Sequence, residues 1–276
     1  MPIAKPKHWN DDLAEEEYVV PQPICAPTQE VWDRMTEAER AAVIESLPIV
    51  VEDDFMSEGD CHAEVVTNAA HMLDWHFRHG GGRGRTLYVG KSVQVYYPGA
   101  ASFAPDVFVV LDVPDGPRDS WVVAAEGKGL DFALEVHWKG SKKKDFADNV
   151  VMFAARGIPE YFIFDRARLQ ILGYRLRPGG GNYHPILPQG GRYYSQVLGL
   201  WISREGEFFR FSDGDSALPT ARELVVRLTN AMAEAEASAA AESARATAEA
   251  EARLALEARV AELVAQLAAL NPPNQA

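Results

Sequence analysis

The sequence predicts an α/β (α+β) fold: a mixed sheet flanked by helices, followed by a long C-terminal helix. Apolar residues with helical spacing precede a block of short segments rich in β-branched and aromatic residues, which is typical of a helix followed by strands. A second helical segment interrupts that block, and this order favours a mixed sheet with helices packed on it. The last stretch, 221–270, is rich in alanine, glutamate and arginine and contains no glycine or proline, which predicts a long helix.

The 276 residues suit one domain of catalytic size with an appendage. A hydrophobic content of 47% with 24% charged residues is ordinary for a globular protein and excludes disorder throughout. Two cysteines, Cys25 and Cys61, cannot build a disulfide framework, which fits a reducing compartment. No apolar run is long enough to span a membrane, and the N-terminus has no hydrophobic signal core. We therefore expect a cytoplasmic protein without a membrane partner.

The net charge of −13 is unevenly distributed. Residues 1–60 carry 15 acidic against 4 basic side chains, and residues 231–276 carry 7 against 3. The middle of the chain, 61–230, carries 18 against 20 and is close to neutral. Because no region is strongly basic, composition alone does not indicate a nucleic-acid partner.

Four regions follow from these patterns. Residues 1–30 are acidic and proline-bearing and are expected to form a loosely ordered arm. Residues 31–220 are expected to form one folded domain, residues 221–270 a helix, and residues 271–276 a short tail.

Within the domain, apolar spacing predicts helices over 31–47, 62–77 and 142–156. Proline and glycine residues end each of them. Strands are predicted at 86–97, 107–113, 121–125, 132–138, 160–164 and 169–176, with 198–202 and 208–211 as a terminal hairpin.

The C-terminal helix carries a heptad seam near its end. Its apolar residues are spaced alternately by four and three: Leu256, Val260, Leu263, Leu267 and Leu270. The seam upstream is mainly alanine, which weakens tight pairing there. We expect a coiled coil that makes the protein a homodimer; a single exposed or folded-back helix is the alternative.

Two carboxylates stand out in the predicted sheet. Asp106 directly precedes the apolar strand at 107, and Glu135 interrupts another apolar strand. Alternation places Glu135, His137 and Lys139 on one face of that strand. Two converging carboxylates oppose each other's ionisation unless a cation lies between them, and carboxylate oxygens suit Mg²⁺ or Mn²⁺. Such a metal polarises a phosphate and activates water, while a nearby lysine stabilises the developing negative charge.

A wider pattern surrounds these two residues. It consists of His62 opening a helix, Pro105-Asp106, Glu135-Val136, Asp145, the segment GIPEYF at 157–162, Asp165, and GYRL at 173–176. This pattern resembles the PD-(D/E)XK nuclease superfamily and, more narrowly, the Uma-2 family of restriction endonucleases, from about residue 62 to the C-terminus. The resemblance implies a restriction-endonuclease-like core, a DNA substrate, and a Mg²⁺ held by Asp106, Glu135 and the Val136 carbonyl oxygen. It also makes Glu64 on the first helix a candidate acidic ligand.

The chain departs from the pattern at both usual lysine positions. His137 stands two residues after Glu135, and Asn149 stands four residues after Asp145. His137 could act as a general base or beside the metal, but Asn149 cannot supply a charge. Candidate substitutes for the lysine are Lys128, Lys139, Lys142, Lys143 and Lys144, of which the last three could instead contact DNA phosphates.

Other interpretations of the same residues remain open. Asp106 could be a turn residue after proline, and Glu135 could form a structural salt bridge with Lys128 or Lys139. The departures could also mark a catalytically decayed, nuclease-like protein that binds nucleic acid or regulates. A third hypothesis is an interaction protein whose C-terminal helix is the working part.

Overall fold

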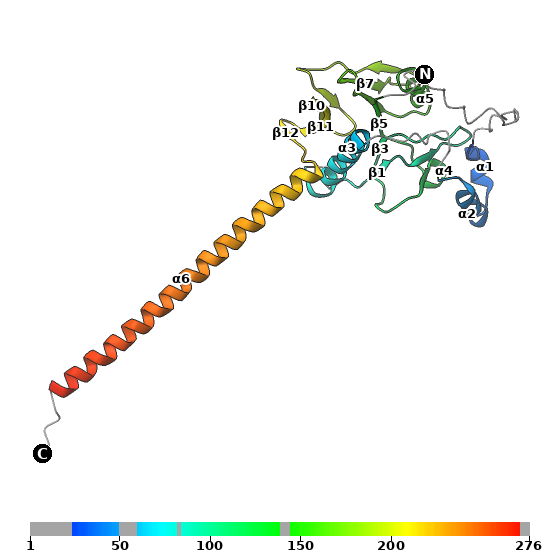
Figure 1. The fold of residues 1–276 in the computed structure, drawn as a ribbon. Helices are drawn as coiled ribbons and strands as arrows, with labels where there is room; N and C mark the ends of the chain where they lie inside the picture. Colours follow the sequence, from blue (N-terminus) through cyan, green and yellow to red (C-terminus); the bar gives the residue numbers. More distant parts are fainter. Residues whose placement is uncertain (1–23, 50–59, 82–83, 139–143, 271–276) are drawn as a thin grey trace, which may run out of the picture. The chain divides into compact units, whose positions relative to one another are not determined.

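A computed structural model describes residues 24–49, 60–81, 84–138 and 144–270 (Figure 1). The chain divides into two compact units, Met1–Leu218 and Pro219–Ala276. The first contains all the strands, and the second contains the helix α6 (Ala221–Leu270). Most of the predicted arm and the tail at 271–276 lie outside the described residues.

The first unit begins with helices and continues as a β-rich block. Its helical elements are α1 (Gln29–Arg34), α2 (Glu37–Ser46), α3 (Asp60–His79), α4 (Val123–Glu126), the π-helical turn η2 (Lys144–Asp148) and α5 (Asn149–Ala155). Its strands are β1 (Leu87–Lys91), β2 (Gln94–Tyr96), β3 (Val107–Leu111), β4 (Ser120–Val122), β5 (Phe132–His137), β6 (Glu160–Asp165), β7 (Gln170–Leu176), β8 (Tyr183–Pro185), β9 (Tyr193–Ser195), β10 (Leu200–Glu205), β11 (Phe208–Asp213) and β12 (Ser216–Ala217).

The main sheet has the order β1-β3-β5-β6-β7-β8. Only β5 and β6 pair in parallel, and η2 and α5 lie in the connection between them, as a parallel pair requires. All other neighbours in this sheet pair antiparallel. The predicted mixed sheet flanked by helices and the long C-terminal helix are therefore confirmed.

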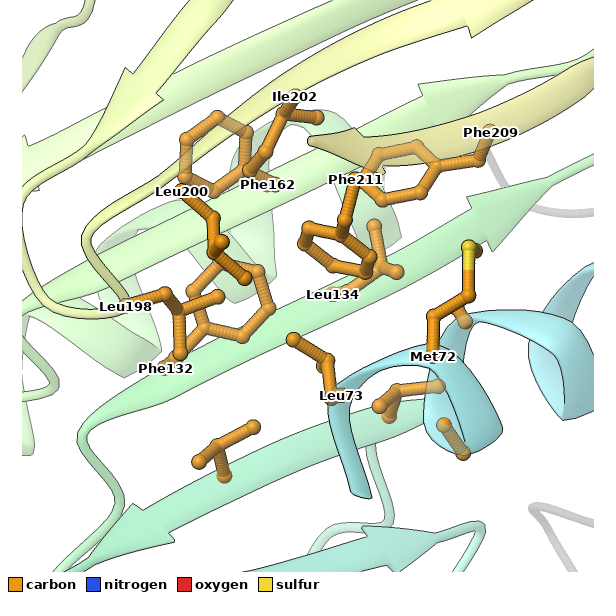
Figure 2. Packing of buried hydrophobic residues seen from close by; sticks show 14 of the residues in the cluster. Met72, Leu73, Phe132, Leu134, Phe162, Leu198, Leu200, Ile202, Phe209 and Phe211 are labelled. Carbon is orange, nitrogen blue, oxygen red and sulfur yellow. The ribbon is translucent and has the colours of Figure 1, made fainter. Parts of the chain in front are cut away.

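One face of the main sheet is covered by α3 and by a second sheet of order β12-β11-β10-β9. Phe132 and Leu134 of β5 and Phe162 of β6 are fully buried there. They meet Leu73 of α3 and Phe211 of β11 in one apolar cluster (Figure 2). The predicted terminal hairpin is confirmed as β10 and β11, and its aromatic residues close this half of the core.

The opposite face of the sheet packs against α5 and the parallel pair β2 and β4. Phe108, Ala133 and Tyr161 point to this side and meet Trp121 of β4 and Phe153 of α5. Since β3, β5 and β6 are thus buried on both faces, they read in the sequence as nearly continuous apolar runs. The polar residues of a central strand that can carry chemistry are consequently those near which its pairing with a neighbouring strand stops.

Several predicted elements are wrong in detail. The helix expected over 31–47 is two helices, because Thr36 begins a new one as an N-cap, with a capping box to Glu39. The strand expected over 86–97 is β1 and β2, because Ser92 adopts a positive φ of 51° that turns the chain. The segment 121–125 leaves the sheet after Val122 and forms the short helix α4.

The helix α6 is described by itself. Its 50 residues are unbroken, and the apolar side chains Leu256, Val260, Leu263 and Leu267 are 44–66% exposed. Among the described residues, no helix is long and apolar enough to cross a membrane.

The packing of the second sheet on the main sheet predicts that truncation of two residues of β11 lowers the free energy of unfolding by very different amounts. Phe211 is 0% exposed and Phe208 is 44% exposed. Phe211→Ala should lower the free energy of unfolding by about 3–5 kcal/mol, because it removes a ring from the shared cluster. Phe208→Ala should change it by less than about 1 kcal/mol. Urea denaturation of both variants measures the difference, and equal losses would contradict this packing.

Candidate active site

The start of β3, the end of β1 and the second half of β5 meet at one place on the main sheet. Asp106 directly precedes β3, and the β3–β5 register pairs Val107 with Leu134. One further step along this antiparallel register sets Asp106 opposite Glu135. On the other side, β1 ends at Lys91, which pairs with Val107. The amide of the next residue, Ser92, donates to the Asp106 carbonyl oxygen at 3.1 Å.

The carboxylates of Asp106 and Glu135 each lie against a backbone amide in the segment that carries the other carboxylate. The Asp106 Oδ2 atom accepts from the amide of Val136 at 2.6 Å. The Glu135 Oε2 atom lies 3.5 Å from the amide of Asp106. These side chains replace ladder hydrogen bonds where the β3–β5 pairing ends, so each carboxylate is held by the strand that carries the other.

A helix from each face of the sheet adds a side chain to this pair. From α3, the Nε2 atom of His62 lies 3.4 Å from Asp106 Oδ1, and both side chains are 14% exposed. From α5, the Nδ2 atom of Asn149 donates to Glu135 Oε1 at 3.3 Å, and Asn149 is 4% exposed. The structure thus brings together Asp106, Glu135, Val136 and Asn149 of the predicted site residues, together with the pattern residue His62.

The oxygen atoms of this cluster fit a hard divalent cation. Two carboxylates with a neighbouring backbone carbonyl are oxygen ligands, which Mg²⁺ and Mn²⁺ prefer. No group of three or more His, Cys, Asp or Glu side chains suited to a metal occurs in the described part of the chain. A cation here would therefore complete its coordination with water and substrate oxygens, as Mg²⁺ usually does.

Two candidates are placed differently from this cluster. His137 shares the Glu135 face of β5, but its ring is buried and packs edge-on against Phe146, with centroids 5.1 Å apart. Lys128 pairs with Asp131 at 2.9 Å and donates to the carbonyl oxygen of Leu111. Leu111 ends β3, about 14 Å along the strand from its start. Lys128 therefore serves the opposite end of β3 from Asp106.

The remaining candidates are only partly described. Lys139, Lys142 and Lys143 lie outside the described residues. The backbone of Lys144 and Asp145 forms the first turn of η2, where a regular helix was expected. Glu64 is exposed on the first turns of α3, two residues after His62.

Lys91 is a basic residue near the site that the sequence did not single out. It is the last residue of β1, next to the start of β3, and its Nζ atom lies 3.3 Å from the hydroxyl of Thr67 on α3. A lysine at a strand end carries no motif, so only the pairing of β1 with β3 reveals that it flanks Asp106.

Glu160 of the segment GIPEYF has a structural role. It is 0% exposed and accepts from Arg175 Nε at 2.8 Å, from the amide of Gln196 at 3.0 Å and from the hydroxyl of Ser195. These contacts join β6 to β7 and β9. Glu160 pairs with Phe132 at the start of β5, three residues before Glu135, so its network lies away from Asp106.

A family model named Uma2, with the description "Putative restriction endonuclease", matches residues 54–205. A crystal structure described as "a putative nuclease belonging to DUF820 from Anabaena variabilis ATCC 29413" is 13% identical, with a TM-score of 0.40. The match covers 57% of this chain and 89% of that one. The search of curated proteins gave no match.

The network around Glu160 predicts a loss of stability without a loss of metal affinity. Glu160→Ala leaves Arg175 without its buried partner and should lower the free energy of unfolding by about 3–5 kcal/mol. Glu207→Ala, at an exposed position, should stay within about 0.5 kcal/mol of the parent. Urea denaturation measures the free energy of unfolding, and titration with Mn²⁺ measures the metal affinity. A lowered metal affinity in folded Glu160→Ala protein would contradict the separation of the two sites.

Proposed function

Since this chain belongs to the Uma2 family of restriction endonucleases, we propose that it is a metal-dependent endonuclease that hydrolyses phosphodiester bonds of DNA. One observation carries the proposal: Asp106 and Glu135 are fixed against each other where β3 and β5 meet, through the amides of Val136 and Asp106. Two carboxylates at one point of the sheet offer the oxygen ligands that a hard divalent cation prefers.

Asp106, Glu135 and the carbonyl oxygen of Val136 hold the cation, Mg²⁺ or Mn²⁺. When bound, such a metal polarises a phosphodiester oxygen and lowers the pKa of a water molecule. Asn149 donates to Glu135 and keeps one carboxylate oxygen in a set direction. The Nε2 atom of His62 lies 3.4 Å from Asp106 Oδ1 and limits where that carboxylate can turn. Both are positioning residues, since they act through the carboxylates.

Lys91 takes the place of the usual lysine. Its strand pairs directly with β3 and its ammonium group lies on the α3 side of the sheet, near Thr67. A lysine here stabilises the negative charge that builds on the phosphate oxygens during attack. Lys142, Lys143 and Lys144 precede α5 in the sequence and remain proposed contacts for the DNA backbone.

A decayed nuclease that binds DNA without cutting it is the second candidate. Asn149 favours it, because a neutral amide donates to Glu135 where a lysine would bring a charge. Lys91 distinguishes the two, since a nuclease needs its charge and a decayed protein does not.

The carboxylate pair predicts that Asp106→Asn and Glu135→Gln each lower Mn²⁺ affinity and plasmid cleavage more than about 100-fold, since changes merely behind a metal ligand already cost roughly 10–100-fold. Both substitutions keep the shape and polarity of the side chain. Asp112→Asn, at the far end of β3 and paired with Arg85, is the matched control. Calorimetric titration with Mn²⁺ and cleavage of supercoiled plasmid give the two readouts.

Unchanged metal affinity in both carboxylate variants would show that neither Asp106 nor Glu135 is a metal ligand. This result does not depend on which DNA substrate is chosen. Normal metal binding by the parent without cleavage of several DNA substrates would favour the decayed protein.

The position of Lys91 predicts that Lys91→Ala lowers the cleavage rate about 100- to 1,000-fold, the usual effect of losing one group that stabilises transition-state charge. Metal affinity should be little changed, because Lys91 is not a ligand. Lys128→Ala, which removes a structural pair with Asp131, should retain the rate. Equal rates for Lys91→Ala and the parent would assign the positive charge to another residue.

A further inference from the structure

The heptad seam of α6 runs through the whole helix without a change of register. Counted back from Leu256 in alternating steps of three and four, it reaches Met232, Leu228 and Val225. These three side chains are 56–64% exposed, and the apolar residues at the other end of the seam are exposed as well. The 50 residues of α6 span about 75 Å at 1.5 Å per residue. The exposed apolar residues at both ends of this seam are a surface for another long helix.

The middle of the seam carries charges where a coiled coil is usually apolar. Glu242, Glu249 and Arg253 occupy seam positions and are exposed. In a parallel, in-register pair every seam residue faces itself across the axis. Glutamate would then face glutamate and arginine would face arginine, in three charged layers interrupted only by Ala246. Like charges at such positions oppose association.

We propose that α6 pairs with the α6 of a second copy of this chain in an antiparallel coiled coil that runs nearly end to end. In the register we infer, Glu242 faces the partner's Arg253, and by symmetry Arg253 faces the partner's Glu242. Both charged groups then have an opposite charge in the facing layer. The partner is a second copy of this chain, because the seam matches a copy of itself in charge and size only when that copy runs in the opposite direction.

The remaining layers of this register also fit by size. Large side chains of one end meet small ones near the middle: Ala239 faces the partner's Leu256, and Ala235 faces the partner's Val260. Towards the ends, apolar residues meet each other, with Met232 facing the partner's Leu263 and Leu228 facing the partner's Leu267. Alternation of large and small residues across facing positions fills a helix interface without voids.

The two central layers are less apolar. Ala246 faces the partner's Glu249, whose methylene groups can cover the small methyl while the carboxylate reaches water. A register shifted by one heptad sets Glu242 against the partner's Val260 and leaves Leu228 without an apolar partner. The end-to-end register is therefore the better of the two. This inference concerns α6 alone and does not depend on the proposed nuclease activity.

Cross-linking of the full chain tests the register. In a background of Cys25→Ser and Cys61→Ser, the variants Ala239→Cys and Leu256→Cys are mixed, equilibrated under reducing conditions and then oxidised. We expect a disulfide-linked dimer that contains one chain of each variant, and little linkage when either variant is oxidised alone. Leu263→Cys, one heptad further on, is the matched control and should link poorly to Ala239→Cys. Efficient linkage of Ala239→Cys to itself would establish a parallel pair and overturn the proposal.

Charge reversal tests the same register without cysteines. Arg253→Glu should weaken the dimer about tenfold or more, because the introduced carboxylate would face the partner's Glu242 in both charged layers. The double variant Glu242→Arg with Arg253→Glu should restore the parent affinity. In a parallel pair, neither change alters the like-charge layers. Light scattering over a concentration series measures the association, and a parent chain that stays monomeric at about 100 µM overturns the proposal.

Discussion

The antiparallel pairing of β3 with β5 is the constraint on which the rest of the structure depends. Its register sets the start of one buried strand beside the second half of another, so that Asp106 lies opposite Glu135. The Asp106 carboxylate then accepts from the amide of Val136 at 2.6 Å, and the Glu135 carboxylate lies 3.5 Å from the amide of Asp106. A shift of this register by one residue would turn Glu135 into the cluster that Leu134 now fills. The core and the candidate site are therefore specified by the same pairing.

Burial on both faces explains why the polar groups gather where the pairing of β3 with β5 stops. The cluster around Phe132 and Phe162 and the cluster around Phe108 and Tyr161 enclose the central strands. An unpaired charge within either cluster would cost several kcal/mol, roughly, through lost hydration. Glu160 is tolerated at 0% exposure because three donors surround it. The helices α3 and α5, which cover opposite faces, bring His62 and Asn149 to the same carboxylate pair.

Much of the fold and part of the site could be predicted from the sequence. The alternation of Leu134, Glu135 and Val136 indicated a strand with one carboxylate on the less apolar face, and the structure has that arrangement. The boundaries of helices and strands were harder to predict from the sequence, because each depends on the conformation of a single residue. The positive φ of Ser92 and the capping box of Thr36 divide elements that the periodicity of apolar residues joins. Lys91 was missed and Lys128 was considered, although Lys128 lies at the far end of β3. A spacing along the chain cannot tell which end of a strand a side chain serves.

By itself, the sequence determined the local properties of this protein: which segments are helical or extended, which residues are apolar, and where one carboxylate precedes an apolar strand and another interrupts one. The helix α6 belongs to the same class, since its seam is a one-dimensional pattern in a single helix. Only the tertiary structure decided which strands are neighbours, and with that which residue of β1 lies beside the start of β3. The physical reason is that strand pairing joins residues far apart in the chain, so each partner is chosen by the packing of the whole sheet.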